Sequence, residues 1–184
     1  MTLAQKYSHF LIIPSPESSL KSRIHTVEVF LDLICPFSKK MFMTLMKSNI
    51  QFIFRPQIQP WHPQSALLHY AVMAVGINNP VQVISALLAL YNASDLFQDI
   101  KVQSLSPNEV YIEIASVLAK NGVEFRPSYL LNDLLVQEMK YHIKYSRQLG
   151  VHVSPTVYID GIRDDNFSSS WTVDQWNTYL STIN

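Results

Sequence analysis

Cysteine and glycine are scarce in this sequence, with one cysteine and four glycines in 184 residues. A single cysteine cannot form an internal disulfide, and a chain of this length buries about 70% of its unfolded surface, so its stability needs neither a disulfide nor a metal staple. With 48% hydrophobic and 15% charged residues, the composition excludes collagen and intrinsic disorder. We therefore expect one folded domain, since a domain typically has about 150 residues.

An excess of charge and long apolar runs are also lacking. The 14 Lys and Arg residues balance 14 Asp and Glu residues, so the surface has no broad positive field to attract nucleic acid or anionic lipid. The most apolar stretches, residues 70–77 and 83–91, are shorter than the roughly 18 residues of a membrane-spanning helix. The apolar run at 10–13 is too short for a signal peptide. We predict an intracellular, cytoplasmic protein without nucleic acid or membrane partners.

The first part of the chain predicts a β-α-β unit behind a leader segment. Residues 1–24 mix Pro, Ser and Lys without periodicity, which predicts a leader laid over the surface of a domain at 25–184. Residues 25–33 alternate and are rich in β-branched and aromatic types, as in a strand. A helical pattern at 37–47 precedes a second strand pattern at 50–58. A connection of this length predicts two parallel strands.

Residues 64–149 predict a mostly helical insertion. The predicted helices cover residues 64–77, a segment that opens at Pro80, residues 106–121 and residues 132–149. Ser106 and Glu109 have the spacing of a capping box, which marks a helix start. Glycine directly after Asn121 is typical of a helix end.

The strand pattern returns after the insertion. Residues 155–159 predict a strand, residues 160–161 (Asp-Gly) a hairpin turn, and a short edge strand is predicted through 166–167. Thr172 and Gln175 form a second capping box at the start of a last helix. The whole pattern predicts an α/β domain whose sheet resumes after the helices.

Cys35 stands where the first predicted strand meets the first predicted helix. Pro36 follows it, in the position where proline opens helices. A sulfur at a helix N-terminus faces unpaired N–H groups and the positive end of the helix dipole, which stabilise thiolate over thiol. Lys39 and Lys40 add positive charge one turn on, and we expect the Ser38 hydroxyl to turn back toward the sulfur and donate to it. The alternative is that Cys35 is a small buried hydrophobe.

These features together resemble a known superfamily. The order of strand, CPFS at 35–38, β-α-β unit, helical insertion and VSPT at 153–156 before a strand is similar to the thioredoxin superfamily, in its DsbA-like branch. Residues 32–38 (DLICPFS) resemble the start of the FrnE, 2-hydroxychromene-2-carboxylate isomerase and kappa glutathione transferase relatives. The resemblance implies a thioredoxin-like fold over 25–184 with an inserted α-helical sub-domain.

The resemblance also implies roles for single residues. Cys35 and Ser38 are the expected catalytic residues of the motif, together with Pro155, which is expected to have a cis peptide bond and to lie against the cysteine. The backbone of Ser154 is expected to pair with an extended substrate. Residues 36–37 (Pro-Phe), beside the cysteine, are the next expected substrate contacts.

Trp61 and His62 lie in the predicted loop between the second strand and the insertion. That loop tends to rim the active site in proteins of this fold, so both residues are candidates for substrate binding. The alternative is that His62 is a surface or structural histidine. His69 and His142 form no metal-ligand set with their sequence neighbours, and we predict no metal and no tightly bound cofactor.

The sequence departs from the pattern of these relatives at several positions. Dithiol enzymes of this fold have a second cysteine where Ser38 stands, and a buried acid where Val29 stands. Dithiol chemistry is therefore excluded. Kappa transferases and the isomerases usually have serine where Cys35 stands, and Val153 replaces a common glycine.

Three functions remain open. The leading hypothesis is a monothiol oxidoreductase or thiol transferase, in which Cys35 forms a mixed disulfide that an external thiol such as glutathione resolves. Its partners are thiol or disulfide substrates, either protein or glutathione, with glutathione a possible co-substrate. The second hypothesis is a binding module that has the fold without the chemistry. The third, weaker one is an iron–sulfur cluster held by Cys35 and glutathione. The physiological substrate and the oligomeric state stay open.

Overall fold

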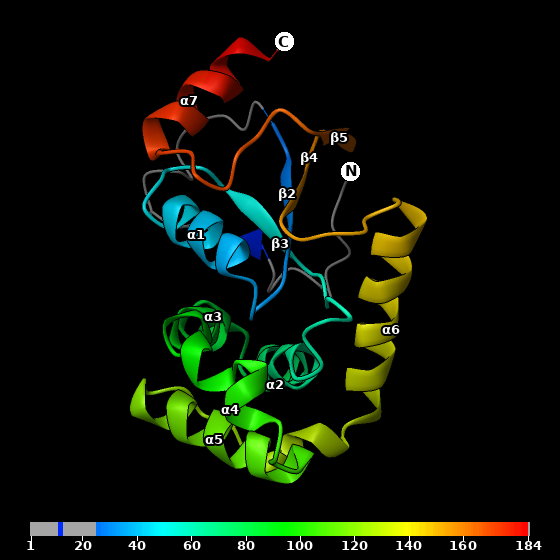
Figure 1. Ribbon diagram of the computed structural model, residues 1–184. Helices are drawn as coiled ribbons and strands as arrows, with labels where there is room; N and C mark the ends of the chain where they lie inside the picture. Colours follow the sequence, from blue (N-terminus) through cyan, green and yellow to red (C-terminus); the bar gives the residue numbers. More distant parts are fainter. Residues whose placement is uncertain (1–10, 13–24, 184) are drawn as a thin grey trace.

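The computed structural model describes residues 11–12 and 25–183, and a mixed sheet forms its centre (Figure 1). Within those residues the sheet has five strands in the order β1-β3-β2-β4-β5. The strands are β1 (Leu11–Ile12), β2 (Val27–Leu31), β3 (Phe52–Pro56), β4 (Thr156–Ile159) and β5 (Ile162–Asp164). β2 and β3 are parallel, and the other neighbours are antiparallel. The predicted α/β class and thioredoxin-like arrangement are confirmed.

Helix α1 (Pro36–Leu45) connects β2 and β3 and packs on one face of the sheet. β2 is buried on both faces, so its side chains enter two different environments. Val27, Val29 and Leu31 join the main core with Phe42 of α1. Phe30 points the other way, into a small cluster with Tyr145 and Tyr158. Cys35 follows the end of β2, so the sheet determines the position of the cysteine.

The helical insertion gathers at one end of the sheet, and its last helix returns along the face opposite α1 (Figure 1). Its elements are α2 (Ser65–Asn78), η3 (Pro80–Gln82), α3 (Val83–Asn92), η4 (Ser94–Phe97), α4 (Asp99–Val102), α5 (Pro107–Lys120), η5 (Pro127–Leu131) and α6 (Asp133–Gln148). The Ser106–Glu109 capping box is present, and Gly122 has a φ of 72° after the end of α5. The helix starts and ends predicted from capping residues are therefore confirmed.

The C-terminal part is a hairpin followed by helix α7 (Val173–Thr182). Asp160 and Gly161 both have positive φ, as a two-residue hairpin turn requires. The predicted edge strand is present as β5, but its extension through residues 166–167 is wrong, because β5 ends at Asp164. The Asp164 carboxylate accepts the Asn166 N–H at 2.8 Å, and this local turn replaces strand pairing. α7 begins at the predicted Thr172 cap, with its capping box complete.

Part of the predicted surface leader belongs to the sheet. β1 pairs antiparallel with β3, with Ile12 opposite Phe52, and the Ile12 side chain is fully buried. A strand of two residues is too short to show alternation, so the sequence pattern did not reveal it. The rest of the predicted leader, residues 1–10 and 13–24, lies outside the described residues. Among the described residues, none of the helices has both the length and the apolar character required to cross a membrane.

Candidate thiol site

Cys35 is the N-cap residue of α1, and Pro36 occupies the first helical turn. The position therefore matches the prediction from sequence. Cys35 has 6% of its surface exposed, and its Sγ–H donates to the Ser154 carbonyl oxygen at 3.5 Å. This bond joins the start of α1 to the loop before β4.

Asp32 folds the turn that carries Cys35. Its carboxylate is fully buried and accepts three backbone N–H groups, from Ile34 at 2.7 Å, Cys35 at 3.2 Å and Gln59 at 2.7 Å. The sequence resemblance included Asp32 but implied no role for it at the site. An aspartate just before a helix cap could have indicated this role, because its carboxylate commonly accepts the backbone N–H of the residue two positions later.

Ser38 takes a different role from the one predicted. Its buried hydroxyl accepts the Asp32 N–H at 3.2 Å, instead of donating to the sulfur. Asp32 lies directly after the last residue of β2, so its N–H has no strand partner and the hydroxyl satisfies it. Lys39 and Lys40 bond to the hydroxyls of Ser94, at 3.2 Å, and Ser170, at 3.1 Å. Neither ammonium group is directed at the sulfur.

The loop before β4 lies against Cys35 because of the strand order. β4 pairs antiparallel with β2, with Phe30 opposite Thr156, so the start of β4 lies beside the end of β2. The Ser154–Pro155 peptide bond is cis, and the Thr156 hydroxyl donates to the Val153 carbonyl at 2.7 Å. The sheet thus brings together Cys35 and Ser154, which are 119 residues apart in sequence.

Gln59 joins these two loops and was not predicted. Its side chain has 1% of its surface exposed. The donors and acceptors around it assign the orientation of its amide, because the opposite orientation sets the NH2 group against the Ser154 N–H. With the amide oxygen toward Ser154, it accepts the Ser154 N–H at 2.6 Å and the Ser154 hydroxyl at 3.3 Å, while its NH2 group donates to the His152 carbonyl at 3.3 Å. A glutamine in a loop carries no pattern that reveals such partners, so only the fold identifies it.

The remaining predicted contact residues lie on the surface. Phe37 is 60% exposed and Trp61 is 57% exposed, while His62 is half-buried. The rings of Trp61 and His62 are tilted at 56° to each other, with centroids 6.4 Å apart. In the described part of the chain, neither of these two is hydrogen-bonded to Cys35. Phe37 therefore lies in the first turn of α1, two residues after the cysteine, and Trp61 and His62 lie on the loop that contains Gln59.

The helical insertion supports the Cys35 turn with two buried side chains. His69 of α2 accepts the Leu33 N–H through Nε2 at 3.3 Å. Burial lowers the pKa of His69 to about 4, so the ring is neutral near pH 7; Asp32 opposes this shift and His142 adds to it. The Tyr91 hydroxyl of α3 donates to the Asp32 carbonyl at 3.4 Å. Burial, followed by Asp32 and Cys35, raises the pKa of this phenol well above its usual range.

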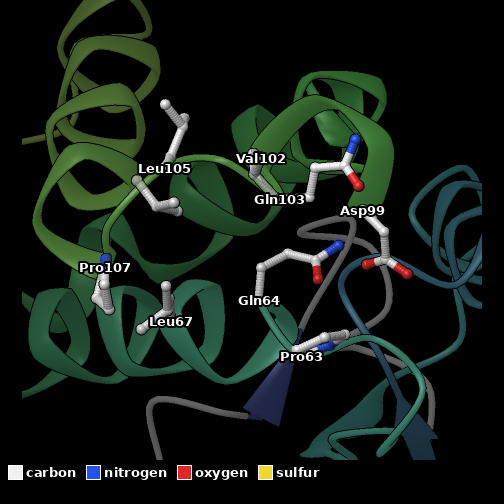
Figure 2. A pocket seen from close by; sticks show the side chains of 9 residues that line it. Pro63, Gln64, Leu67, Asp99, Val102, Gln103, Leu105 and Pro107 are labelled. Carbon is white, nitrogen blue, oxygen red and sulfur yellow. The ribbon is translucent and has the colours of Figure 1, made fainter.

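A cavity of about 450 Å³ lies in the insertion and does not include the cysteine (Figure 2). Leu67, Val102 and Leu105 give it a largely apolar wall, and Gln64 points into it from the start of α2. Two of its lining residues, Pro63 and Gln64, belong to the segment that also contains Gln59. Elsewhere in the described residues, no three His, Cys, Asp or Glu side chains are grouped to hold a metal ion.

Comparison with known proteins supports the fold. No protein-family model and no curated protein matches the sequence. A crystal structure from Pseudomonas syringae, provisionally assigned as a protein-disulfide isomerase, matches with a TM-score of 0.79 and 25% identity over 96% of this chain and 99% of that one. The thiol-disulfide exchange protein α-DsbA2 from Wolbachia pipientis matches with a TM-score of 0.62 and 16% identity over 89% and 84% of the two chains.

The catalytic domain of Proteus mirabilis ScsC is similar to the same degree, with a TM-score of 0.62 and 18% identity over 88% of this chain and 84% of that domain. The chain therefore has the thioredoxin-like fold of DsbA-like proteins. The finer resemblance to the FrnE, isomerase and kappa transferase relatives stays a prediction.

Proposed function

We propose that this protein carries out thiol-disulfide exchange through Cys35 alone, with an external thiol such as glutathione completing the cycle. The observation that carries the proposal is the Cys35 thiol at the N-terminus of α1, with its sulfur 3.5 Å from the Ser154 carbonyl oxygen in a thioredoxin-like fold. The descriptions of the neighbours support it, since one is a thiol-disulfide exchange protein and another a provisional protein-disulfide isomerase.

The first step is attack of the Cys35 thiolate on the glutathione sulfur of a mixed disulfide between a substrate and glutathione. The substrate's S–S bond breaks, a new disulfide joins Cys35 to glutathione, and the substrate thiolate leaves and takes a proton from water. Cys35 is the N-cap residue of α1, where the positive end of the helix dipole favours an anionic attacking group. The Asp32 carboxylate holds the Cys35 N–H, and so fixes the backbone that carries the sulfur.

The second step regenerates Cys35. The thiolate of a second glutathione attacks the glutathione sulfur bound to Cys35, which releases glutathione disulfide and returns the Cys35 thiolate. Overall, the mixed disulfide and one reduced glutathione give the free substrate thiol and one glutathione disulfide. An external thiol is needed because the chain has one cysteine, and Ser38 at the resolving position forms no disulfide.

The test is glutathione-dependent reduction of a small mixed disulfide, followed by coupled glutathione reductase. We expect wild-type protein to be active and Cys35→Ser to be inactive at unchanged thermal stability. Ile112→Ser, a change at an exposed position of α5 in the helical insertion, is the control and is expected to keep the activity. Equal activity of wild type and Cys35→Ser would refute the proposal.

A second candidate, a non-enzymatic binding module, is favoured by the low exposure of Cys35 and the high exposure of its neighbours. Cys35 is 6% exposed, against 60% for Phe37 and 57% for Trp61. A covered sulfur and exposed apolar rings suit non-covalent recognition better than attack on a disulfide. This candidate expects no turnover in the same assay, and a protein partner bound equally by wild type and Cys35→Ala.

A further inference from the structure

Both backbone groups of Ser154 are engaged within the protein. Its carbonyl accepts the Cys35 Sγ–H at 3.5 Å, and its N–H is held by the Gln59 amide oxygen at 2.6 Å. A polypeptide whose disulfide is attacked by Cys35 has to approach the sulfur past Ser154, whose carbonyl lies 3.5 Å from it. The carbonyl is released when the sulfur loses its proton, but the N–H that could pair with such a chain stays occupied by Gln59.

The Gln59 amide has the chemistry of a peptide unit. It offers one carbonyl and one N–H donor, and it uses them on the Ser154 N–H and the His152 carbonyl. These are two backbone groups of the loop directly before β4, of the kind that a peptide uses when it pairs with a protein backbone. Gln59 thus stands where one peptide group of an extended partner belongs.

Gln59 is also held in place from its own backbone. Its N–H donates to Asp32 Oδ2 at 2.7 Å, and Oδ1 of the same carboxylate accepts the Cys35 N–H at 3.2 Å. The bonds run from Cys35 to Asp32, to Gln59, to Ser154 and back to the sulfur. A side chain with 1% exposure in such a ring does not leave without exposing unpaired polar groups.

We propose that Gln59 is a specificity-determining residue that closes the backbone edge beside Cys35. It directs the site toward low-molecular-weight disulfides, which need no strand pairing, and away from extended polypeptide disulfides, which must displace it. This inference rests on the proposed thiol-disulfide exchange and names its substrate class. The expected discrimination is about tenfold, on the order of one buried hydrogen bond lost.

The experiment measures the second-order rate of mixed-disulfide formation at Cys35 with two probes. One probe is the mixed disulfide of glutathione and 2-mercaptoethanol, and the other is an unstructured peptide of about ten residues with one glutathionylated cysteine. We expect Gln59→Ala to raise the peptide rate about tenfold and to change the small-probe rate by less than about twofold. Gln57→Ala is the matched control, a buried glutamine two residues earlier on the same loop, and is expected to change neither rate.

Amide hydrogen exchange gives a second readout in the same variants. Loss of the Gln59 acceptor is expected to accelerate exchange at Ser154 in Gln59→Ala and not in Gln57→Ala. Unchanged selectivity between the probes in Gln59→Ala, or equal loss of both rates, would overturn the role of Gln59. If wild-type Cys35 reacts with neither probe while the unfolded chain reacts with both, the proposed function fails, and the inference fails with it.

Discussion

Strand β2 carries one buried carboxylate within it and another directly after it, and the protein holds the two in different ways. Asp32 is bound by three backbone N–H groups in the Cys35 turn. Glu28, on the face opposite α1, is bound by side chains: Arg55 Nε lies 2.6 Å from its Oε2, and the Tyr145 hydroxyl donates to the same carboxylate. The Arg55 guanidinium also lies 4.5 Å from the centre of the Tyr145 ring.

The two carboxylates therefore have different roles: Asp32 shapes the Cys35 turn, and Glu28 stabilises the fold. A carboxylate bound to backbone amides fixes the path of the chain, so Asp32 positions the backbone of Cys35. A carboxylate bound to side chains fixes packing, so Glu28 links β2 to Arg55 of β3 and to Tyr145 of α6. Because side chains alternate along a strand, Glu28 faces away from the core that contains Val29. Glu28 therefore does not supply the acid that the sequence lacks at position 29.

The largest effect is expected from breaking the Glu28–Arg55 pair. Arg55→Leu leaves Glu28 as an unpaired buried charge, and we expect a loss of about 3–5 kcal/mol in the free energy of unfolding. The double variant Glu28→Leu with Arg55→Leu is expected to recover most of this loss. Urea denaturation measures both. A loss in Arg55→Leu below about 1 kcal/mol would show that Glu28 does not depend on Arg55 as its buried partner.

Neutralising each acid in turn sharpens the comparison. Asp32→Asn replaces one acceptor oxygen by an NH2 group against the Gln59 N–H, and about 2–3 kcal/mol of stability is expected to be lost. It is also expected to change the rate of Cys35 alkylation by iodoacetamide, because the turn moves. Glu28→Gln is expected to leave the alkylation rate within about twofold of wild type. Equal effects of both variants on alkylation would remove the distinction.

Acidification tests the support that His69 gives to the turn. The pKa of His69 falls from 6.5 to about 4 on burial, so between these values the unfolded chain binds more protons than the folded one. The stabilisation is complete above pH 6.5 and is lost as the pH falls through this window, by about 2 kcal/mol at pH 5. His69→Gln, whose carbonyl also accepts the Leu33 N–H, is expected to lack this part of the pH dependence. Parallel curves for the two proteins in urea unfolding would contradict the assignment.

The smallest effect is expected at Ser38. Ser38→Ala leaves the Asp32 N–H unsatisfied, at a cost of about 1 kcal/mol in the free energy of unfolding. The pH dependence of Cys35 alkylation is expected to stay the same, because the hydroxyl binds backbone and not sulfur. A shifted alkylation profile at unchanged stability would restore the role predicted from sequence.

The architecture could be predicted because it depends on local signals. Helix starts at Ser106 and Thr172 follow from capping boxes, and the hairpin turn follows from the Asp-Gly pair at 160–161. The parallel β2 and β3 pair follows from the length of its connection. Each signal lies within a few residues of the element that it defines, so no tertiary contact is needed to interpret it. β1 and α4 lack such a signal because they are only two and four residues long.

The details of the site could be predicted only in part, because they depend on contacts between distant segments. Cys35 at the helix start is a local feature, and the sequence placed it correctly. The orientation of Ser38 depends on an N–H that β2 leaves free, and the role of Gln59 depends on the loop before β4. Such partners become visible only when the strand order brings the loops together.

Glutathionylation of the folded chain tests most directly whether Cys35 is an exchanging thiol. Wild-type protein and Cys35→Ser are incubated with glutathione disulfide, and then with reduced glutathione, and intact mass is recorded in buffer and in urea. We expect one glutathione on folded wild type, none on Cys35→Ser, removal by reduced glutathione, and a faster reaction in the folded than in the unfolded chain. A folded chain that stays unmodified while the unfolded chain reacts would contradict a role for Cys35 in thiol-disulfide exchange.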